Sequence, residues 1–411
     1  MAGIRPFRAI RPREELASEI AALPYDVYDR REAKEAVDKN PGSFLCIDRA
    51  ETFFPDSVST YAPEVYERAK ALFWQWLKEG RFLKEETECY YIYELTMDGR
   101  VQTGIAATAS IDDYENGVIK KHENTRAEKE EDRVRHVDTI GAQTGPIFLA
   151  YRSNPVLEEI LQAEKQKEPL YDFTAEDRVR HRVFRIDDPF VIRRIEDTFR
   201  TIDKIYIADG HHRAASAVRV GKKRRQENPG YTGEEEFNFF LSVLFADKDL
   251  AIMDYNRVVK DLNGLTEEEL LTEVKSRFEV ASEDTEILRP DDRYSFSMYL
   301  KDKWYLCRIR KEDRLSDPVK GLLVSRLQDL LLDPVLGIRD PKTDERIDFV
   351  GGIRGLKELE RRCHTDCRVA FAMYPTSIGE LFSVADAGLL MPPKSTWFEP
   401  KLRSGLLCHE I

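Results

Sequence analysis

Apolar and polar positions follow two different periods along this chain, which predicts a mixture of helices and strands. Residues 62–80 place apolar side chains at helical intervals and end on a glycine suited to a C-cap, so they predict an amphipathic helix. Residues 89–111 contain two β-rich runs around Asp98-Gly99, a sequence typical of a hairpin turn. The first part of the chain is therefore expected to be a small α+β region.

A second feature of this region is a proline between two helical patterns. Pro24 is expected to end an early helix, because proline removes a helical hydrogen bond. Asp29 is a good N-cap for a following helix that runs to Asn40. The residues Tyr25–Val27 are therefore expected in a loop.

The middle of the chain alternates between strand and helix patterns. A charged helical stretch begins near Ile119, ends near Gly141 and leads into the apolar run PIFLAY. The strand candidates VFRIDD and KIYIADG flank a helical segment, PFVIRRIEDTFRTI. This order predicts a mixed α/β core.

The rest of the chain predicts further strands and helices. Residues 237–259 predict a long buried strand and a second strand joined by a short turn. Residues 266–278 and 321–332 predict helices, and residues 294–309 predict a hairpin. The fold class is therefore expected to be α/β (mixed α+β), and we predict the following regions: 1–115, an N-terminal α+β region; 116–262, an α/β core; 263–411, a C-terminal α+β region.

Composition narrows the classes of partner. A formal net charge of -12 disfavours nucleic acid and membrane surfaces, since proteins that bind these carry a surplus of Lys and Arg. No apolar run approaches the length of a membrane span, and six scattered cysteines without a secretory start predict free thiols in a cytoplasmic protein. A small-molecule partner fits better, and the sequence leaves a homo-oligomer open.

The stretch IYIADGHHRAASAV carries the strongest candidate chemistry. An apolar strand ends at Asp209, Gly210 lets the backbone approach a ligand, and a helix begins behind it. Free N–H groups and Arg213 are suited to a phosphate, and His211 and His212 are suited to donating hydrogen bonds or moving protons. Asp209 is a candidate Mg²⁺ ligand or general base. In the alternative interpretation Asp209 only caps the helix.

A second stretch, KKHENTRAEKEEDRVRH, combines acids, bases and imidazoles before a predicted helix start. A His-Glu pair at such a place is typical of proton and phosphate handling. The alternative, a solvated charged helix, applies mainly to residues 128–135. The candidate functional residues here are Lys121, His122, Glu123, Thr125 and Arg126.

Two motifs near the C-terminus give weaker signals. In MPPKSTWFEPKLRSGL, the side chains of Lys394, Ser395 and Thr396 are candidates to close on phosphate, although a proline-pinned loop packed on aromatic residues would have the same sequence. Cys363 and Cys367 in CHTDC predict two free thiols more readily than a zinc site, because a second cysteine pair is missing.

Several of these stretches together resemble a known family of prokaryotic proteins, domain of unknown function 1015. The residues that carry this resemblance are Leu23–Val27, Lys121–Glu123 with Thr125, Asp132-Arg133, Asp209–Arg213, Phe349–Gly352, Met391–Thr396 and Pro400-Lys401. They span nearly the full length of the chain, but the family's name states no function.

The run Asp209–Arg213 also resembles the phosphate-binding motif of the ParB/sulfiredoxin-like superfamily, which includes free-serine kinases. This resemblance implies a ParB/sulfiredoxin-like nucleotide-binding core, with a nucleotide phosphate on Gly210 to Arg213. It also implies an assisting glutamate, for which we choose Glu123, with Asp26 and Glu32 as alternatives. Ser216 stands where the ParB pattern has alanine. Together with the negative net charge of the chain, this difference disfavours DNA binding of the ParB kind.

Three functions compete at this point. The leading hypothesis is a phosphotransferase that passes a phosphate from ATP or ADP, with Mg²⁺, to the hydroxyl of a small serine-like metabolite. The second is a nucleotide-binding or nucleotide-hydrolysing switch without a small-molecule acceptor. The third is a metal-dependent hydrolase that uses Asp209, His211 and His212 as ligands.

Overall fold

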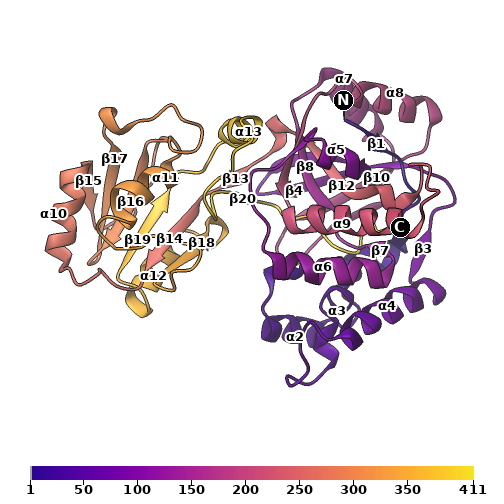
Figure 1. Ribbon diagram of the computed structural model, residues 1–411, viewed down its shortest axis with the longest axis horizontal. Coiled ribbons are helices and arrows are strands. Elements are labelled where there is room, and N and C mark those ends of the chain that lie inside the picture. Colours follow the sequence, from indigo (N-terminus) through magenta and orange to yellow (C-terminus); the bar gives the residue numbers. More distant parts are fainter. Residues whose placement is uncertain (1) are drawn as a thin grey trace. The chain divides into compact units, whose positions relative to one another are not determined.

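The computed structural model describes residues 2–411 and divides them into two compact units (Figure 1). The first unit comprises Met1–Leu250 with Pro400–Ile411, and the second comprises Ala251–Glu399. The three regions expected from the sequence, 1–115, 116–262 and 263–411, stay a prediction. The two units are defined only by how compactly their residues pack in space.

The first unit is built on a mixed nine-stranded sheet in the order β6-β11-β8-β12-β5-β4-β10-β9, with β1 beside β5. Two pairs, β11 with β6 and β12 with β8, are parallel, and the other pairs are antiparallel. The strands are β1 (Ile4–Arg5), β4 (Tyr90–Met97), β5 (Arg100–Ser110), β6 (Ile119–Lys120), β8 (Ile147–Tyr151), β9 (Tyr171–Thr174), β10 (Arg180–Ile186), β11 (Ile205–Asp209) and β12 (Phe239–Ala246).

Helices cover this sheet, and α6 and α9 lie side by side (Figure 1). Short pairs of strands, β2 (Ile10–Pro12) with β3 (Phe82–Lys84) and β7 (Ala142–Gln143) with β21 (His409–Glu410), lie outside the large sheet. The α-helices are α1 (Ala17–Ile20), α2 (Arg30–Lys39), α3 (Leu45–Asp48), α4 (Pro63–Lys78), α5 (Ile111–Glu115), α6 (Ala127–Ile140), α7 (Pro155–Glu164), α8 (Pro189–Phe199) and α9 (His211–Glu227).

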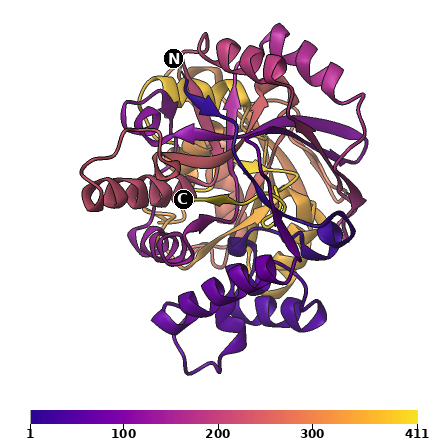
Figure 2. The ribbon, with the colours of Figure 1, turned by 90° about the vertical axis from the view of Figure 1, so that its right-hand side faces the viewer.

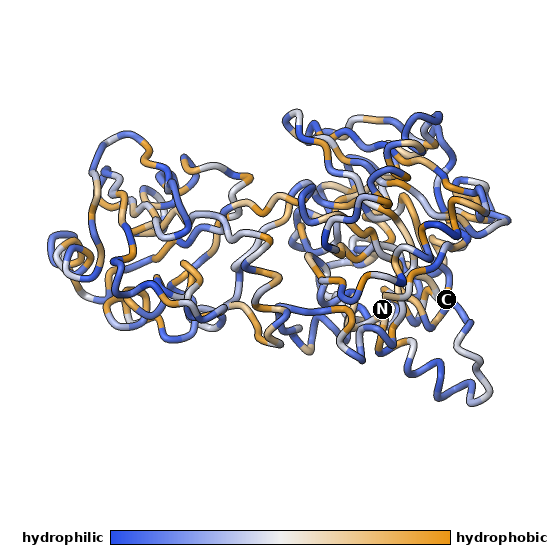
Figure 3. The backbone as a smooth tube through the Cα atoms, turned by 90° about the horizontal axis from the view of Figure 1, so that it is seen from above, coloured by the Kyte–Doolittle hydropathy of each residue, from blue (hydrophilic) through white to orange (hydrophobic). Residues whose placement is uncertain are grey.

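The core of the first unit has two parts. Apolar side chains of the central strands, such as Ile105, Leu149 and Phe240, pack with α5, α7, α8 and α9. A separate aromatic cluster around Phe44, Phe73 and Trp76 holds the N-terminal helices together. These helices, indigo and purple at the bottom of Figure 2, form their own layer, and hydrophobic stretches, orange in Figure 3, run through the interior of the unit.

Local sequence signals account for many of the element boundaries in this unit. Asp29 caps α2 and forms a capping box with Glu32, and Gly141 ends α6 in a left-handed conformation at φ 75°. The predicted β4–β5 hairpin turns at Asp98 and Gly99, which both have positive φ. Tyr25–Val27 forms a single 3₁₀ turn, η2, after Pro24, in agreement with the predicted loop.

The second unit is an antiparallel six-stranded sheet in the order β15-β17-β16-β19-β14-β18. A two-stranded pair, β13 (Ile252–Met253) with β20 (Trp397–Phe398), lies apart from it. The strands are β14 (Tyr255–Val259), β15 (Phe278–Asp284), β16 (Ser295–Leu300), β17 (Lys303–Ile309), β18 (Ile347–Gly351) and β19 (Val369–Met373). The helices are α10 (Glu267–Arg277), α11 (Leu323–Leu327), extended by a π-helical turn (Gln328–Leu332), α12 (Lys357–Thr365) and α13 (Ile378–Asp386).

The structure confirms the mixed α/β fold class and corrects two local expectations. Residues 237–259 do not form one hairpin, because β12 belongs to the sheet of the first unit and β14 to that of the second. The helical stretch expected from Ile119 begins only at Ala127, after an extended segment. Within residues 2–411, no helix combines the length and the apolar character that a membrane crossing requires.

Candidate functional site

The junction between β11 and α9, which we call the β11–α9 corner, forms as the sequence predicts. Asp209 ends β11, and Gly210 is the N-cap of α9 with φ 91°, a left-handed conformation that favours glycine. A Cβ atom at Gly210 would lie 3.0 Å from Nε of Arg213. No side chain accepts a hydrogen bond at this cap, so the first N–H groups of α9 are without a capping acceptor. Such a helix start attracts anions.

Two cations surround the carboxylate of Asp209. Oδ2 lies 3.3 Å from Nζ of Lys401 and 3.8 Å from Nη2 of Arg213. Burial raises the pKa of Asp209, but the charges of Lys401 and Arg213 outweigh it and hold this pKa well below its usual range. Asp209 is therefore ionised at neutral pH, and the three side chains together carry one net positive charge.

A backbone contact fixes the guanidinium of Arg213. Its Nη1 donates a hydrogen bond of 2.6 Å to the carbonyl of Pro146, next to the start of β8. Because this bond and the contact with Asp209 use opposite parts of one planar group, the orientation of the side chain is set without a ligand. Lys401 is the partner that the sequence did not identify, since it lies 192 residues from Asp209.

Two histidines are buried beside this corner. The rings of His122 and His211 meet edge to face with centroids 4.5 Å apart, and the backbone N–H of His122 donates to Nε2 of His211 at 3.5 Å. His122 is 2% exposed and neither of its ring nitrogens makes a hydrogen bond of ordinary geometry, although the backbone of Ile207 is close enough to favour the protonated ring slightly. This unpartnered imidazole is the most conspicuous unsatisfied group near the corner.

Burial decides the charge of both rings. It lowers the pKa of His122 to about 4 and that of His211 well below its ordinary value, with a further contribution from His122. Both imidazoles are therefore neutral at pH 7, and they offer hydrogen bonds without adding charge. Burial also lowers the pKa of His212, whose Nε2 accepts a hydrogen bond of 2.9 Å from the backbone N–H of Arg126.

The segment 121–126 brings the side chains of His122 and Glu123 to the corner and uses others elsewhere. Oε2 of Glu123 lies 4.0 Å from Nδ1 of His211, and the Glu123 side chain is 44% exposed. The Thr125 hydroxyl donates to Glu130, and Nζ of Lys121 lies over the ring of Tyr114. Lys121 and Thr125 line a surface depression of about 410 Å³ along α9. The structure thus joins Glu123 and the backbone of Arg126 to the two histidines of the motif.

Two cavities that share part of their lining were not predicted, and only the smaller one borders Arg213. A small one, about 30 Å³, is lined by Arg213, Tyr25 and Asp48, among others. A larger one, about 170 Å³, shares Tyr25, Asp48, Arg133 and His136 with the first. Sequence reasoning placed Tyr25 and Arg133 in family motifs without a role, and gave no signal for Asp48.

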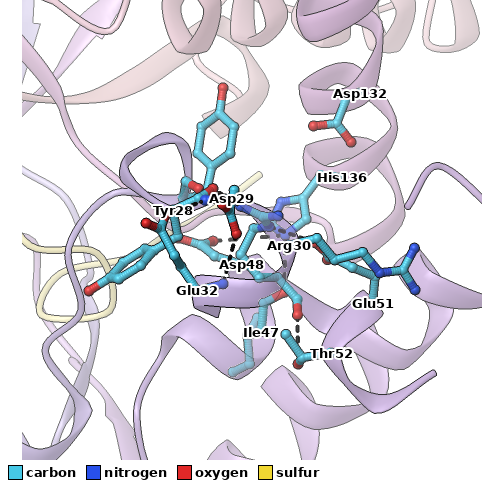
Figure 4. A network of polar contacts seen from close by, with 12 residues as sticks. Tyr28, Asp29, Arg30, Glu32, Ile47, Asp48, Glu51, Thr52, Asp132 and His136 are labelled. Atoms are coloured by element: carbon cyan, nitrogen blue, oxygen red, sulfur yellow. Dashed lines mark hydrogen bonds and ion pairs between the residues drawn. The ribbon is translucent and has the colours of Figure 1, made fainter. Parts of the chain in front are cut away.

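The walls of the larger cavity form a polar network (Figure 4). Asp48 accepts a hydrogen bond of 2.8 Å from the Thr144 hydroxyl, and its Oδ1 lies 3.8 Å from Nε2 of His136. Tyr66 donates to Asp132 at 2.8 Å, and the guanidinium of Arg133 stacks 3.9 Å from the centroid of the Tyr25 ring. Burial lowers the pKa of His136 to about 4, so this ring is neutral at pH 7.

Three other predicted site residues lie outside the β11–α9 corner, and the structure does not arrange the predicted ligands around a metal ion. Lys394, Ser395 and Thr396 belong to the second unit. Within residues 2–411, no group of three or more His, Cys, Asp or Glu side chains is arranged to hold a metal ion. All six cysteines are free thiols, as expected, and Cys363 and Cys367 lie on and just after α12.

Comparison with known proteins gives a family and distant structural likenesses. No curated protein matches the chain. A C-terminally truncated SbnI from Staphylococcus aureus is 12% identical with a TM-score of 0.39, covering 73% of this chain and 87% of that one. A free serine kinase in complex with AMP is 14% identical with a TM-score of 0.32, covering 73% and 91%. We draw no argument about function from likenesses at this level.

A conserved hypothetical protein from Pyrococcus furiosus is a third such likeness, 14% identical with a TM-score of 0.31, covering 75% of this chain and 95% of that one. The family comparison is stronger, because the model described as "Protein of unknown function (DUF1015)" matches residues 4–328, well over half of the chain. The expected family is confirmed: this chain belongs to the DUF1015 family of proteins of unknown function.

Proposed function

We propose that this chain is a nucleotide-dependent phosphotransferase that moves the terminal phosphate of ATP or ADP to the hydroxyl of a small metabolite. The β11–α9 corner is the observation that carries the proposal. It combines a helix start without a side-chain cap, a glycine at φ 91° and the fixed guanidinium of Arg213. Together these groups suit a phosphate, which needs N–H donors and positive charge at close range.

The charges of the corner favour an anion with several negative charges. Lys401, Arg213 and Asp209 together carry one net positive charge, and the helix start adds its partial positive charge to this. Phosphoryl transfer asks a protein mainly to position its reactants and to neutralise charge. The corner supplies both without a rearrangement of Arg213.

The chemistry then needs an acceptor and a place for its proton. The acceptor oxygen forms a bond to the terminal phosphorus while the bond from phosphorus to the leaving phosphate oxygen breaks. Glu123 takes the hydroxyl proton, because it is partly exposed and lies 4.0 Å from the neutral ring of His211, whose Nδ1 supports its orientation. The cavity of about 170 Å³, which shares Tyr25 and Arg133 with the small cavity beside Arg213, offers room for a small acceptor.

Asp209 does not fit a resident metal site. Lys401 and Arg213 already neutralise it, and the Nε2 atoms of His211 and His212 accept hydrogen bonds from the backbone of segment 121–126. The ring nitrogens therefore do not converge with Asp209 on one point, which disfavours a metal-dependent hydrolase. A Mg²⁺ ion would have to arrive with the nucleotide, and no step here depends on it.

A product assay tests the proposal. The protein is incubated with terminally labelled ATP or ADP and a panel of small hydroxyl compounds, and the products are separated by chromatography. A labelled phosphate ester that is absent with Arg213→Ala supports a phosphotransferase. Release of labelled inorganic phosphate alone supports the nucleotide switch. If neither a labelled ester nor labelled phosphate forms and the protein binds no nucleotide, both the phosphotransferase and the switch are overturned.

A further inference from the structure

The second unit contains a buried arginine without an acidic partner. Arg257 lies on β14 and is 4% exposed. Its Nη1 donates to the carbonyl of Tyr255, and its Nη2 donates to the carbonyl of Lys394 at 3.1 Å. Within residues 2–411, no carboxylate forms an ion pair with this guanidinium. Carbonyl oxygens satisfy two of its five N–H donors but cancel none of its charge.

An unpaired buried charge of this kind is costly. Burial lowers the pKa of Arg257 to about 10, so the group is still charged at neutral pH. Two carboxylates on or beside the neighbouring strands have other partners: Asp254 accepts from Asn256 at 2.5 Å, and Asp348 pairs with Arg362 at 2.9 Å. Among the described residues of the unit, no carboxylate thus forms an ion pair with Arg257.

A second cation lies in the turn that contacts Arg257. Lys394 is exposed and has φ 58°, a left-handed conformation that costs free energy for a residue other than glycine. Two hydrogen bonds fix this turn, from the Ser395 hydroxyl to the Pro392 carbonyl at 2.7 Å and from the Thr376 hydroxyl to the Ser395 carbonyl at 3.0 Å. Strain held by such bonds is typical of functional sites.

Both cations lie against one aromatic cluster. Nζ of Lys394 is 5.5 Å from the ring centroid of Tyr255, and the guanidinium carbon of Arg257 is 5.5 Å from that of Phe349. The rings of Tyr255 and Phe349 meet edge to face, with centroids 6.0 Å apart. The cluster thus carries a buried guanidinium over one ring and an ammonium group from an exposed residue over the neighbouring ring.

We propose that Arg257 and Lys394 form a binding site of the second unit for a phosphate-type dianion. The unused N–H groups of Arg257 would bind its oxygens, and Lys394 would close over it from the exposed turn. Such a dianion matches the two positive charges. It is either free phosphate or the phosphate group of a larger metabolite such as a nucleotide.

Calorimetry on the full chain tests the site, with Arg213→Ala as the background so that the β11–α9 corner is weakened. Inorganic phosphate is expected to bind this variant, and adding Lys394→Ala should reduce the affinity about tenfold because one charge-assisted contact is lost. Adding Arg257→Gln should abolish the binding. Arg308→Gln is the matched control, since Arg308 pairs with Asp291 and Asp292.

Two further measurements decide the outcome. ADP titrated into the same background distinguishes the sources of the dianion: tighter binding than phosphate indicates a nucleotide, and equal or weaker binding indicates free phosphate. A crystal soaked in selenate should show an anomalous peak beside Arg257. If the peak is absent there, or if Lys394→Ala and Arg308→Gln have equal effects, the site does not exist. This result stands apart from the product assay, which concerns the first unit.

Discussion

The β11–α9 corner and the Lys394 turn use the same two kinds of cation in different ways. In the corner, Arg213 and Lys401 share the carboxylate of Asp209, which holds both in place when no ligand is bound. In the second unit, neither Arg257 on β14 nor Lys394 in the turn shares such an acid; carbonyl groups hold Arg257, and Lys394 has a strained backbone. A ligand in the corner must therefore compete with a resident carboxylate, whereas a ligand in the turn supplies the missing charge.

Removing the proposed base is expected to have the largest effect. Glu123→Gln keeps the size of the side chain but removes proton acceptance, so turnover should fall at least about 100-fold while nucleotide affinity changes little. Steady-state rates and calorimetry measure the two quantities, with the exposed Glu128→Gln on α6 as control. If the Glu123→Gln variant turns over at the wild-type rate, Glu123 is not the proton acceptor, and Asp209 or Asp26 becomes the candidate.

Removing Arg213 from the corner should have an effect of nearly the same size, but on nucleotide affinity and not on turnover. Arg213→Ala should weaken nucleotide affinity about 100-fold, because a fixed bidentate donor to phosphate is lost. Arg219→Ala, on the same helix but paired with Glu130 and Glu131, should leave the affinity unchanged. Equal affinities of the Arg213→Ala variant and the wild type by calorimetry would contradict the phosphate assignment.

The two units should also differ in their response to acid. Burial lowers the pKa of His122 and His136 to about 4 and that of His181 to about 3, all in the first unit. Each binds a proton more readily when unfolded, so the free energy of unfolding should fall as the pH drops from about 6.5 toward 4. The loss should be about 2 kcal/mol per histidine between pH 7 and pH 5.

Urea unfolding at these two pH values measures this loss. His122→Gln should reduce the difference between the two values by about 2 kcal/mol. His364→Gln, which changes the one histidine of the second unit, 60% exposed beside Asp302, is the control. Equal pH dependence of the His122 variant and the wild type would show that burial does not lower the pKa of His122.

Neutralising Asp209 should leave the cations of the corner without their shared carboxylate, as Arg257 and Lys394 are in the second unit. Asp209→Asn keeps the shape but removes the negative charge beside Lys401 and Arg213, so phosphate affinity should rise about tenfold without added metal. Calorimetry with and without Mg²⁺ checks this. Asp138→Asn on α6 is the control, because Asp138 pairs with Lys223 and Arg224 near the far end of α9. A fall in affinity only in the presence of Mg²⁺ would instead identify Asp209 as a metal ligand.

The smallest effect is expected at the glycine of the corner. Gly210→Ala must keep φ near 91°, which costs about 1 kcal/mol of stability for a residue with a Cβ atom. Thermal unfolding should show the loss. Gly379→Ala in α13, where φ is not positive and space is free, should be neutral or slightly stabilising. Equal melting temperatures of the two variants would contradict the proposed strain at Gly210.

Much of the site could be predicted because its parts are adjacent in sequence. A strand, a glycine and a helix start follow one another at residues 205–218, so their geometry depends on local backbone preferences. The pairing of Asp209 with Lys401, by contrast, joins residues 192 positions apart. No local pattern could show it, and the same holds for the contact of Arg257 with Lys394.

The sequence alone determined many of the helices and strands with their caps and turns, the family, and the strand–glycine–helix stretch that we propose as a phosphate site. It could do so because periodicity, glycine conformation and capping act over a few residues. Only the tertiary structure decided which charges have partners, that segment 237–259 is divided between two sheets, and that the His122 ring is buried without a hydrogen bond of ordinary geometry. Burial and charge pairing depend on residues far apart in the chain, and these set the pKa values and the charges that a ligand meets.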